Sequence, residues 1–136
     1  MSHFTTVQTK ITSLIRLEKV LTELKFNFSK AEVGQKLHVK GYLGQKTEAQ
    51  LVIHASRTYD IGVNVDATTG AVTFVADWEF VETTAGYNQE EFTRKVMQRY
   101  AYHTVKEEVT KRGYTLEDET VDAAGHIHVK VSSWGE

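Results

Sequence analysis

The chain has 136 residues, of which 40% are hydrophobic and 25% charged, and its 16 basic and 18 acidic side chains leave a net charge of −2. This composition excludes an intrinsically disordered protein, and the near balance of charges argues against an extended nucleic-acid-binding surface. The absence of cysteine excludes disulfides, thiol nucleophiles and thiolate-bound metal centres.

The sequence shows neither a secretory leader nor a membrane-spanning run. The first residues lack a cationic segment followed by an apolar core, and no apolar run approaches the length that crosses a bilayer. Proline is absent and no Gly/Ser-rich linker divides the chain. We therefore expect one soluble, cytoplasmic domain over residues 1–136, with no membrane span.

The first two predicted elements are a strand and a helix. Residues 4–11 alternate in the manner of a strand. Thr12 or Ser13 can then cap a helix. This helix carries an apolar stripe that we expect to face a sheet, formed by Leu14, Leu17, Leu21 and Leu24.

Several short strands follow along the chain. Residues 37–40 alternate, and residues 49–55 contain a nearly continuous apolar run that suits a central strand. Residues 61–65 and 72–78 alternate on either side of a turn at 66–70. These two segments form the clearest predicted hairpin of the chain.

A second helix is predicted over residues 88–112. Asn88 and Glu91 have the spacing of a capping box, and Gly113 suits a left-handed stop. One face of this helix holds Phe92, Val96 and Tyr100, and further round lie Ala101, Val105 and Val109. The broad apolar surface indicates packing against more than one element. A final hairpin pairs residues 114–121 with residues 126–131.

The predicted order is strand, helix, several strands, helix and two strands. It indicates an α+β domain, with a mostly antiparallel sheet and two helices packed on one face. The opposite face of the sheet is then either an open binding surface or covered by an oligomer partner.

Two histidines are candidates for a metal site. His126 and His128 are two residues apart on a predicted strand, so both side chains should emerge from the same face. Two imidazoles can begin a metal site, but the sequence identifies no further ligand, apart from His38 and His54 as possible additions. We favour two solvated polar residues, and we expect no cofactor.

The second predicted helix carries the densest group of aromatic, cationic and titratable residues. Arg99, Tyr102 and His103 are candidates for an interaction surface. Glu107, four residues after His103, can orient its imidazole, which would suit a general base. No nucleophile or glycine elbow accompanies it, and we favour a half-buried histidine that ties the helix to the sheet.

The two tryptophans are further interaction candidates. Trp78 ends a predicted strand and Trp134 lies almost at the end of the chain. Tryptophan is usually found in a core or an interface, so each is expected to anchor packing rather than to bind a cofactor.

Several segments together resemble one known family over essentially the whole chain. They are residues 1–6, 57–62, 75–78, 98–103 and 113–116, and the closing Gly125, Val129 and Trp134. The chain is similar to the conserved family of unknown function in cyanobacteria and in red-algal and related plastids, the hypothetical chloroplast open reading frame thirty-five family. Residues 30–45 and 79–89 depart most from the family pattern, and the resemblance supplies no catalytic residues.

The resemblance implies a protein of the cyanobacterial cytosol or the plastid stroma. It further implies an accessory or adaptor role with a protein partner, such as an AAA-type ATPase or a photosynthetic complex. Our leading hypothesis is therefore a non-enzymatic accessory or assembly protein, which can also form a homo-oligomer. The alternatives are a small-ligand or metal-binding regulator, and an enzyme that uses His103.

Overall fold

The computed structural model describes residues 3–133. Its elements in chain order are β1 (Thr5–Gln8), α1 (Leu14–Glu23), β2 (Phe28–Lys30), β3 (Leu37–Lys40), the 3₁₀ turn η1 (Tyr42–Gly44), β4 (Lys46–Ala49), β5 (Leu51–Ile53), β6 (Ile61–Val65), β7 (Val72–Ala76), α2 (Trp78–Ala85), α3 (Gln89–Lys111), β8 (Tyr114–Val121) and β9 (Ile127–Ser133). Within these residues, no helix combines the length and apolar character needed to cross a membrane.

The main sheet is antiparallel throughout and has the strand order β1-β7-β6-β5-β2. The predicted hairpin of β6 and β7 lies at its centre, with Ile61 opposite Ala76 and Val65 opposite Val72. The predicted run 49–55 divides at Gln50, whose backbone N–H donates to Val63 and to the Asn64 side chain. Its second part, β5, is an interior strand as expected.

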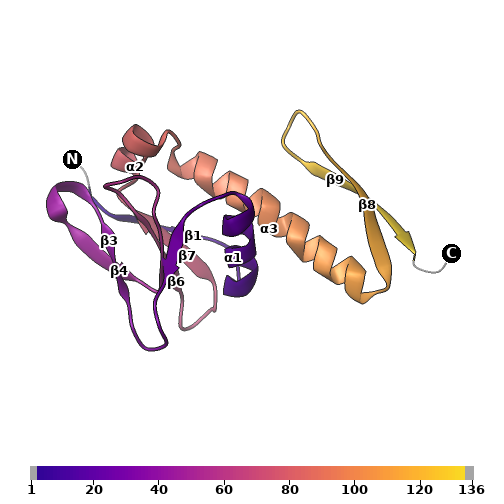
Figure 1. Ribbon diagram of the computed structural model, residues 1–136, viewed down its shortest axis with the longest axis horizontal. Coiled ribbons are helices and arrows are strands. Elements are labelled where there is room, and N and C mark those ends of the chain that lie inside the picture. Colours follow the sequence, from indigo (N-terminus) through magenta and orange to yellow (C-terminus); the bar gives the residue numbers. More distant parts are fainter. Residues whose placement is uncertain (1–2, 134–136) are drawn as a thin grey trace.

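Three helices cover one face of this sheet, one more than expected (Figure 1). The additional helix is α2, because the strand predicted to continue through Trp78 ends at Ala76. All three helices contribute to one buried cluster with the sheet, for instance Leu17 from α1, Val81 from α2 and Phe92 from α3. The α+β class predicted from the sequence is confirmed.

The opposite face of the sheet is covered by the chain itself. The hairpin of β3 and β4 lies over it, and Val39 and Ala49 form a second buried cluster with Val52. Gly62 permits this close approach, because a Cβ atom there would lie 2.7 Å from Val39 Cγ2 and 3.0 Å from Ala49 Cβ. The covering layer is therefore an internal hairpin rather than an oligomer partner.

Helix α3 begins and ends as the sequence predicts. The Asn88 side chain accepts from the Glu91 backbone N–H, and Glu91 accepts in return from the Asn88 N–H. Gly113 follows the helix with a left-handed φ of 83°. Beyond it, β8 and β9 pair only with each other and form a separate two-stranded sheet against α3 (Figure 1).

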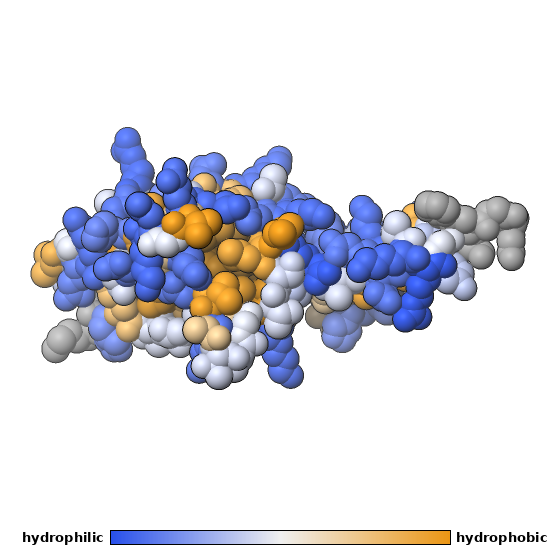
Figure 2. Space-filling model, turned by 90° about the horizontal axis from the view of Figure 1, so that it is seen from below, coloured by the Kyte–Doolittle hydropathy of each residue, from blue (hydrophilic) through white to orange (hydrophobic). Residues whose placement is uncertain are grey.

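The molecule therefore consists of a body, residues 3–100, and an outlying hairpin. We call β8, β9 and the turn between them the C-terminal hairpin. Figure 2 shows this end as a narrow, mostly hydrophilic extension, whereas apolar surface gathers over the body. Helix α3 connects the two parts, and one of its faces packs against the body while another faces the hairpin.

Candidate functional site

Arg99 joins three elements of the fold. Its guanidinium donates to Glu23 at the end of α1 and to Glu119 on β8, and it lies 4.3 Å from the centre of the Tyr102 ring. His103 Nε2 lies 2.6 Å from the second oxygen of Glu23. We call Glu23, Arg99, Tyr102, His103 and Glu119 the Arg99 cluster, which brings together three of the predicted interaction residues.

The predicted pairing of His103 with Glu107 is not present. Glu107 instead contacts Arg16 at 2.5 Å and Lys19 at 3.5 Å on α1. His103 turns to Glu23, and its ring is parallel to that of Tyr102 at 5.1 Å between centres. Local helix spacing offered Glu107 as a partner, but the packing of α1 on α3 supplied a different carboxylate.

The charges of the Arg99 cluster stabilise one another. Burial alone would raise the pKa of the Glu23 carboxyl, but hydrogen bonds from Arg99 and His103 outweigh it and lower that pKa. Burial opposes the charge of Arg99 too, yet its two carboxylate partners raise the pKa of the guanidinium. Burial and Glu119 raise the pKa of Tyr102. These groups are suited to holding α1, α3 and β8 together.

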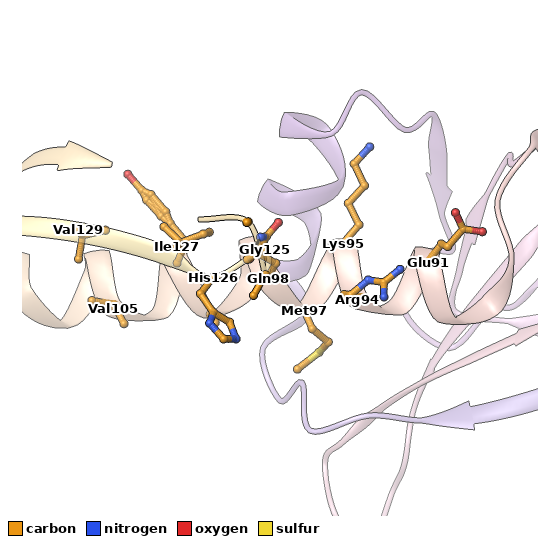
Figure 3. Close-up of a pocket in the computed structure, with 14 residues that line it drawn as sticks. Glu91, Arg94, Lys95, Met97, Gln98, Val105, Gly125, His126, Ile127 and Val129 are labelled. Carbon is orange, nitrogen blue, oxygen red and sulfur yellow. Dashed lines mark hydrogen bonds between the residues drawn. The ribbon is translucent and has the colours of Figure 1, made fainter. Parts of the chain in front are cut away.

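A groove of about 1110 Å³ runs between α3 and the C-terminal hairpin (Figure 3). Its apolar wall on α3 is formed by Met97, Ala101 and Val105, and the facing side chains come from Ile127 and Val129 on β9. Tyr102 of the Arg99 cluster also lines it. We call this hollow the α3–hairpin groove.

One hydrogen bond fixes the position of the hairpin turn over α3. The Gln98 side-chain amide donates to the Gly125 carbonyl oxygen. Together with the Arg99–Glu119 pair, this bond holds the hairpin at two points along its length. These two contacts connect the hairpin to α3, so the two walls of the groove are joined to each other along one side.

The groove carries two cations with no ion-pair partner in residues 3–133. Arg94 and Lys95 line its N-terminal end, are exposed, and make no salt bridge there. Glu91 lies beside them, but one of its oxygens accepts from the Asn88 N–H in the capping box. This end of the groove therefore presents positive charge to an occupant.

His126 and His128 lie on the hairpin and are largely exposed. Both approach Asp122 Oδ2, His128 at 2.8 Å and His126 at 3.6 Å. The hydrogen bond with His128 is the main reason that the pKa of Asp122 is lowered to about 2. No group of three or more histidine, aspartate or glutamate side chains suited to a metal ion occurs in the described part of the chain.

The other histidines considered as ligands belong to the body. His38 lies on β3. His54 lies 2.9 Å from Ser29 Oγ and 3.3 Å from the buried carboxylate of Asp60. Asp60 also accepts the backbone N–H of Lys40 at 2.9 Å, so this polar chain connects β2 to β3 through the segment between β5 and β6.

The two tryptophans have different outcomes. Trp78 begins α2 and is only 8% exposed, with its indole N–H donating to the Thr5 carbonyl at 3.0 Å. Its ring is part of the core against Phe92, as the packing interpretation expected. Trp134 lies outside the described residues.

The wall of the groove was not among the site residues predicted from the sequence. Met97, Ala101 and Val105 recur at four-residue intervals, which is a second apolar stripe on α3. That periodicity was the available signal, and Ala101 and Val105 were indeed assigned to a second face. The residues facing them across the groove depend on the placement of the hairpin, which no local pattern specifies.

Comparison with known proteins gives relatives of similar length. Residues 20–130 match the family described as "Protein of unknown function (DUF1257)". Proteins described as "Uncharacterized protein ycf35" are 31% identical in Guillardia theta and 28% identical in Cyanophora paradoxa. In both comparisons the match covers 98% of this chain and 98% of the relative. No solved structure matches the chain.

Proposed function

We propose that this chain, which belongs to the DUF1257 family of proteins of unknown function, is a non-enzymatic interaction module that binds a segment of a protein partner in the α3–hairpin groove. The observation that carries the proposal is the combination of an apolar wall with two cations that lack ion-pair partners among the described residues. Apolar surface supplies affinity and complementary charge supplies specificity in protein interfaces.

A second hollow of the body provides a useful contrast. It measures about 600 Å³ and is lined by Ile15 and Phe28 together with Lys19 and Lys30. Lys30 pairs with Glu18 at 3.2 Å and Lys19 with Glu107 at 3.5 Å. Its cations thus already have carboxylates, whereas those of the α3–hairpin groove do not, which favours the groove as the docking surface.

The Arg99 cluster supports a scaffold role beside this groove. Arg99 and His103 both bind Glu23, and Arg99 also binds the hairpin through Glu119. Side chains that are already paired in this way are suited to fixing the walls of a groove rather than to binding a substrate. Tyr102, which stacks on Arg99 and lines the groove, connects the cluster to the occupant.

The proposal places the protein in the cyanobacterial cytosol or the plastid stroma, as the resemblance implies. An AAA-type ATPase or a photosynthetic complex is the partner class that the same resemblance suggests. The similarity to relatives in Guillardia theta and Cyanophora paradoxa is compatible with that setting.

Site-specific photo-crosslinking in the source cells tests the proposal. The crosslinking amino acid benzoylphenylalanine is placed at Val105, which lines the groove, and in a control chain at Val33, a more exposed valine on the body. We expect Val105 to crosslink to one defined segment of another protein, identified by mass spectrometry, and Val33 not to do so. Equal labelling from both positions, or none from Val105, would contradict the proposal.

A matched pair of charged substitutions completes the experiment. V105D introduces a carboxylate into the groove, and V33D introduces the same group on the exposed body loop. Both residues are exposed, so both variants should keep the thermal stability of the parent chain. We expect V105D to lose co-purification of the partner that the crosslink identifies, and V33D to keep it. If both variants still bind the partner, the binding surface lies outside the groove.

A further inference from the structure

The strand β9 has a free edge beside the groove. The sheet of β8 and β9 has only these two strands, so β9 has no neighbour on its outer side within the described residues. The hairpin side of the groove is lined by the turn and by β9, and by none of the residues Tyr114–Val121 of β8. The unpaired backbone groups of β9 therefore border the hollow, and such an edge can accept a further strand.

The side chains of β9 differ sharply between its two faces. Ile127 and Val129 line the groove, whereas His128 and Lys130 lie on the outer face. Lys130 has only a distant carboxylate partner, Glu117 at 3.8 Å, and its side chain is 74% exposed. A strand beside β9 would place alternate residues over the apolar groove and next to these basic side chains.

The far end of the groove adds the same charge preference. Arg94 and Lys95 lie on α3 beyond the hairpin turn, on the line that an extended segment would follow past Gly125 (Figure 3). A segment that reaches them meets two cations without salt-bridge partners in residues 3–133. The positive charge without a carboxylate partner thus lies at the end of the groove, whereas His128 and Lys130 on the outer face of β9 have partners in Asp122 and Glu117.

We infer that the occupant of the groove is an extended acidic segment that joins the free edge of β9 as a third strand, with acidic and apolar residues in alternation. This inference rests on the proposed function and specifies the chemistry of the partner. A two-stranded hairpin is marginal in water, and a third strand would give the outward backbone groups of β9 hydrogen-bond partners. A second copy of β9 would fit poorly, because the segment Ile127–Ser133 contains no acidic residue to pair with Arg94 or Lys95.

Three labelled peptides of the length of β9 test the inference. In the first, glutamate and valine alternate; in the second, the same residues stand in two blocks; in the third, lysine replaces glutamate. Binding to the full-length chain is measured by fluorescence polarisation. We expect the alternating acidic peptide to bind at least about tenfold more tightly than the lysine peptide, since several charge contacts are reversed. The block peptide should also bind more weakly.

Two further measurements identify the mode of binding. Binding of the alternating acidic peptide should slow hydrogen exchange at the outward amides of β9. Methylation of the peptide backbone nitrogens should abolish binding of that peptide. The double variant R94E/K130E should reverse the preference toward the lysine peptide. The double variant R57E/K46E, at exposed positions of the body, serves as the matched control. It should keep the preference for the acidic peptide.

The outcomes separate this inference from the proposed function. Equal binding of the alternating and block peptides, or unchanged exchange in β9, would overturn strand addition. If the chain self-associates and this association competes with the peptides, the occupant of the groove is a second copy of the chain rather than an acidic segment. If no peptide binds while V105D still abolishes co-purification of the partner that the crosslink identifies, the groove remains the docking surface and only the strand-addition inference fails.

Discussion

Arg99 is the residue on which the arrangement of α1, α3 and the C-terminal hairpin depends. Its guanidinium bonds to Glu23 and Glu119 and stacks on Tyr102, while only 18% of its side chain is exposed. A planar group with several fixed donors can satisfy two carboxylates and an aromatic face at once, which lysine cannot do. The residue therefore determines how closely β8 approaches the helix.

Replacing Arg99 with methionine should loosen the hairpin. The variant keeps the length and apolar stem of the side chain but leaves Glu23 and Glu119 without their shared cation. We expect a loss of about 1–2 kcal/mol in unfolding free energy and faster hydrogen exchange in β8 and β9. The control R94M removes an arginine that makes no salt bridge in residues 3–133 and should change neither value. Equal exchange in both variants would contradict the role assigned to Arg99.

Glu23 should make stability depend on acid pH. Hydrogen bonds from Arg99 and His103 keep its folded pKa below the ordinary value of 4.5, despite the opposing effect of burial. A carboxyl with a lowered folded pKa stabilises the protein above its unfolded pKa, and this contribution is lost as pH falls through the folded pKa. We expect E23Q to flatten the decline of unfolding free energy below pH 4.5.

Denaturant titrations over a series of pH values measure this effect. The matched control is E32Q, which changes an exposed glutamate outside the helices and strands. The control should follow the parent chain across the same acid range. Parallel curves for E23Q and the parent chain would show that Glu23 gains nothing from Arg99 and His103.

At the scale of elements, the close approach of the β3–β4 hairpin to the main sheet depends on Gly62. A Cβ atom at this position would lie 2.7 Å from Val39 Cγ2 and 2.8 Å from Val75 Cγ1. Such distances are shorter than van der Waals contact, so one layer must move away from the other. Two buried clusters meet across this strand, so the position of Gly62 tolerates little added side-chain volume.

The variant G62A should destabilise the protein by about 1–3 kcal/mol, because it overpacks the contact between the two layers. Thermal or urea unfolding measures the loss. The double variant G62A/V39A removes the Val39 methyl group that collides and leaves the Val75 contact, so G62A should cost less in that background than in the parent chain. Additive losses would mean that β3 does not press on Gly62.

Elements with a strong local pattern were predictable from the sequence. The alternation in β6 and β7 and the Asn88–Glu91 capping box each depend on residues close together in the chain. Helix α2 was missed because the alternating pattern of β7 continues through Trp78, so strand and helix share the same apolar residues at their junction. Its C-terminal Gly86, with a φ of 85°, was the unused signal.

The partners within the candidate site could not be predicted in the same way. Arg99, Tyr102 and His103 do lie together, since they occupy one helix. Their carboxylates come from α1 and β8, at 76 and 20 residues' separation from Arg99. Such pairs are set by how helices and the hairpin pack, and helix periodicity contains no information on that placement.

At the scale of the whole molecule, the core and the proposed docking surface occupy different parts of the chain. Every member of the main buried cluster lies between Ile11 and Tyr100. No residue of the hairpin from Tyr114 to Ser132 is buried. Stability should therefore reside in the body, and the hairpin should open at lower free energy than the body unfolds. This separation allows the hairpin to move without disturbing the fold.

A chain shortened to residues 1–113 tests this division of roles. It retains the whole buried cluster and the Gly113 stop of α3, and it lacks the hairpin side of the groove. We expect cooperative urea unfolding with only a modest loss of stability, because the hairpin contributes no buried side chains. The shortened chain should also lose the crosslink from Val105 and all binding of the alternating acidic peptide. A shortened chain that fails to unfold cooperatively would show that the hairpin is part of the folding unit, since its ties through Gln98 and Arg99 would then be needed to hold α3 on the sheet.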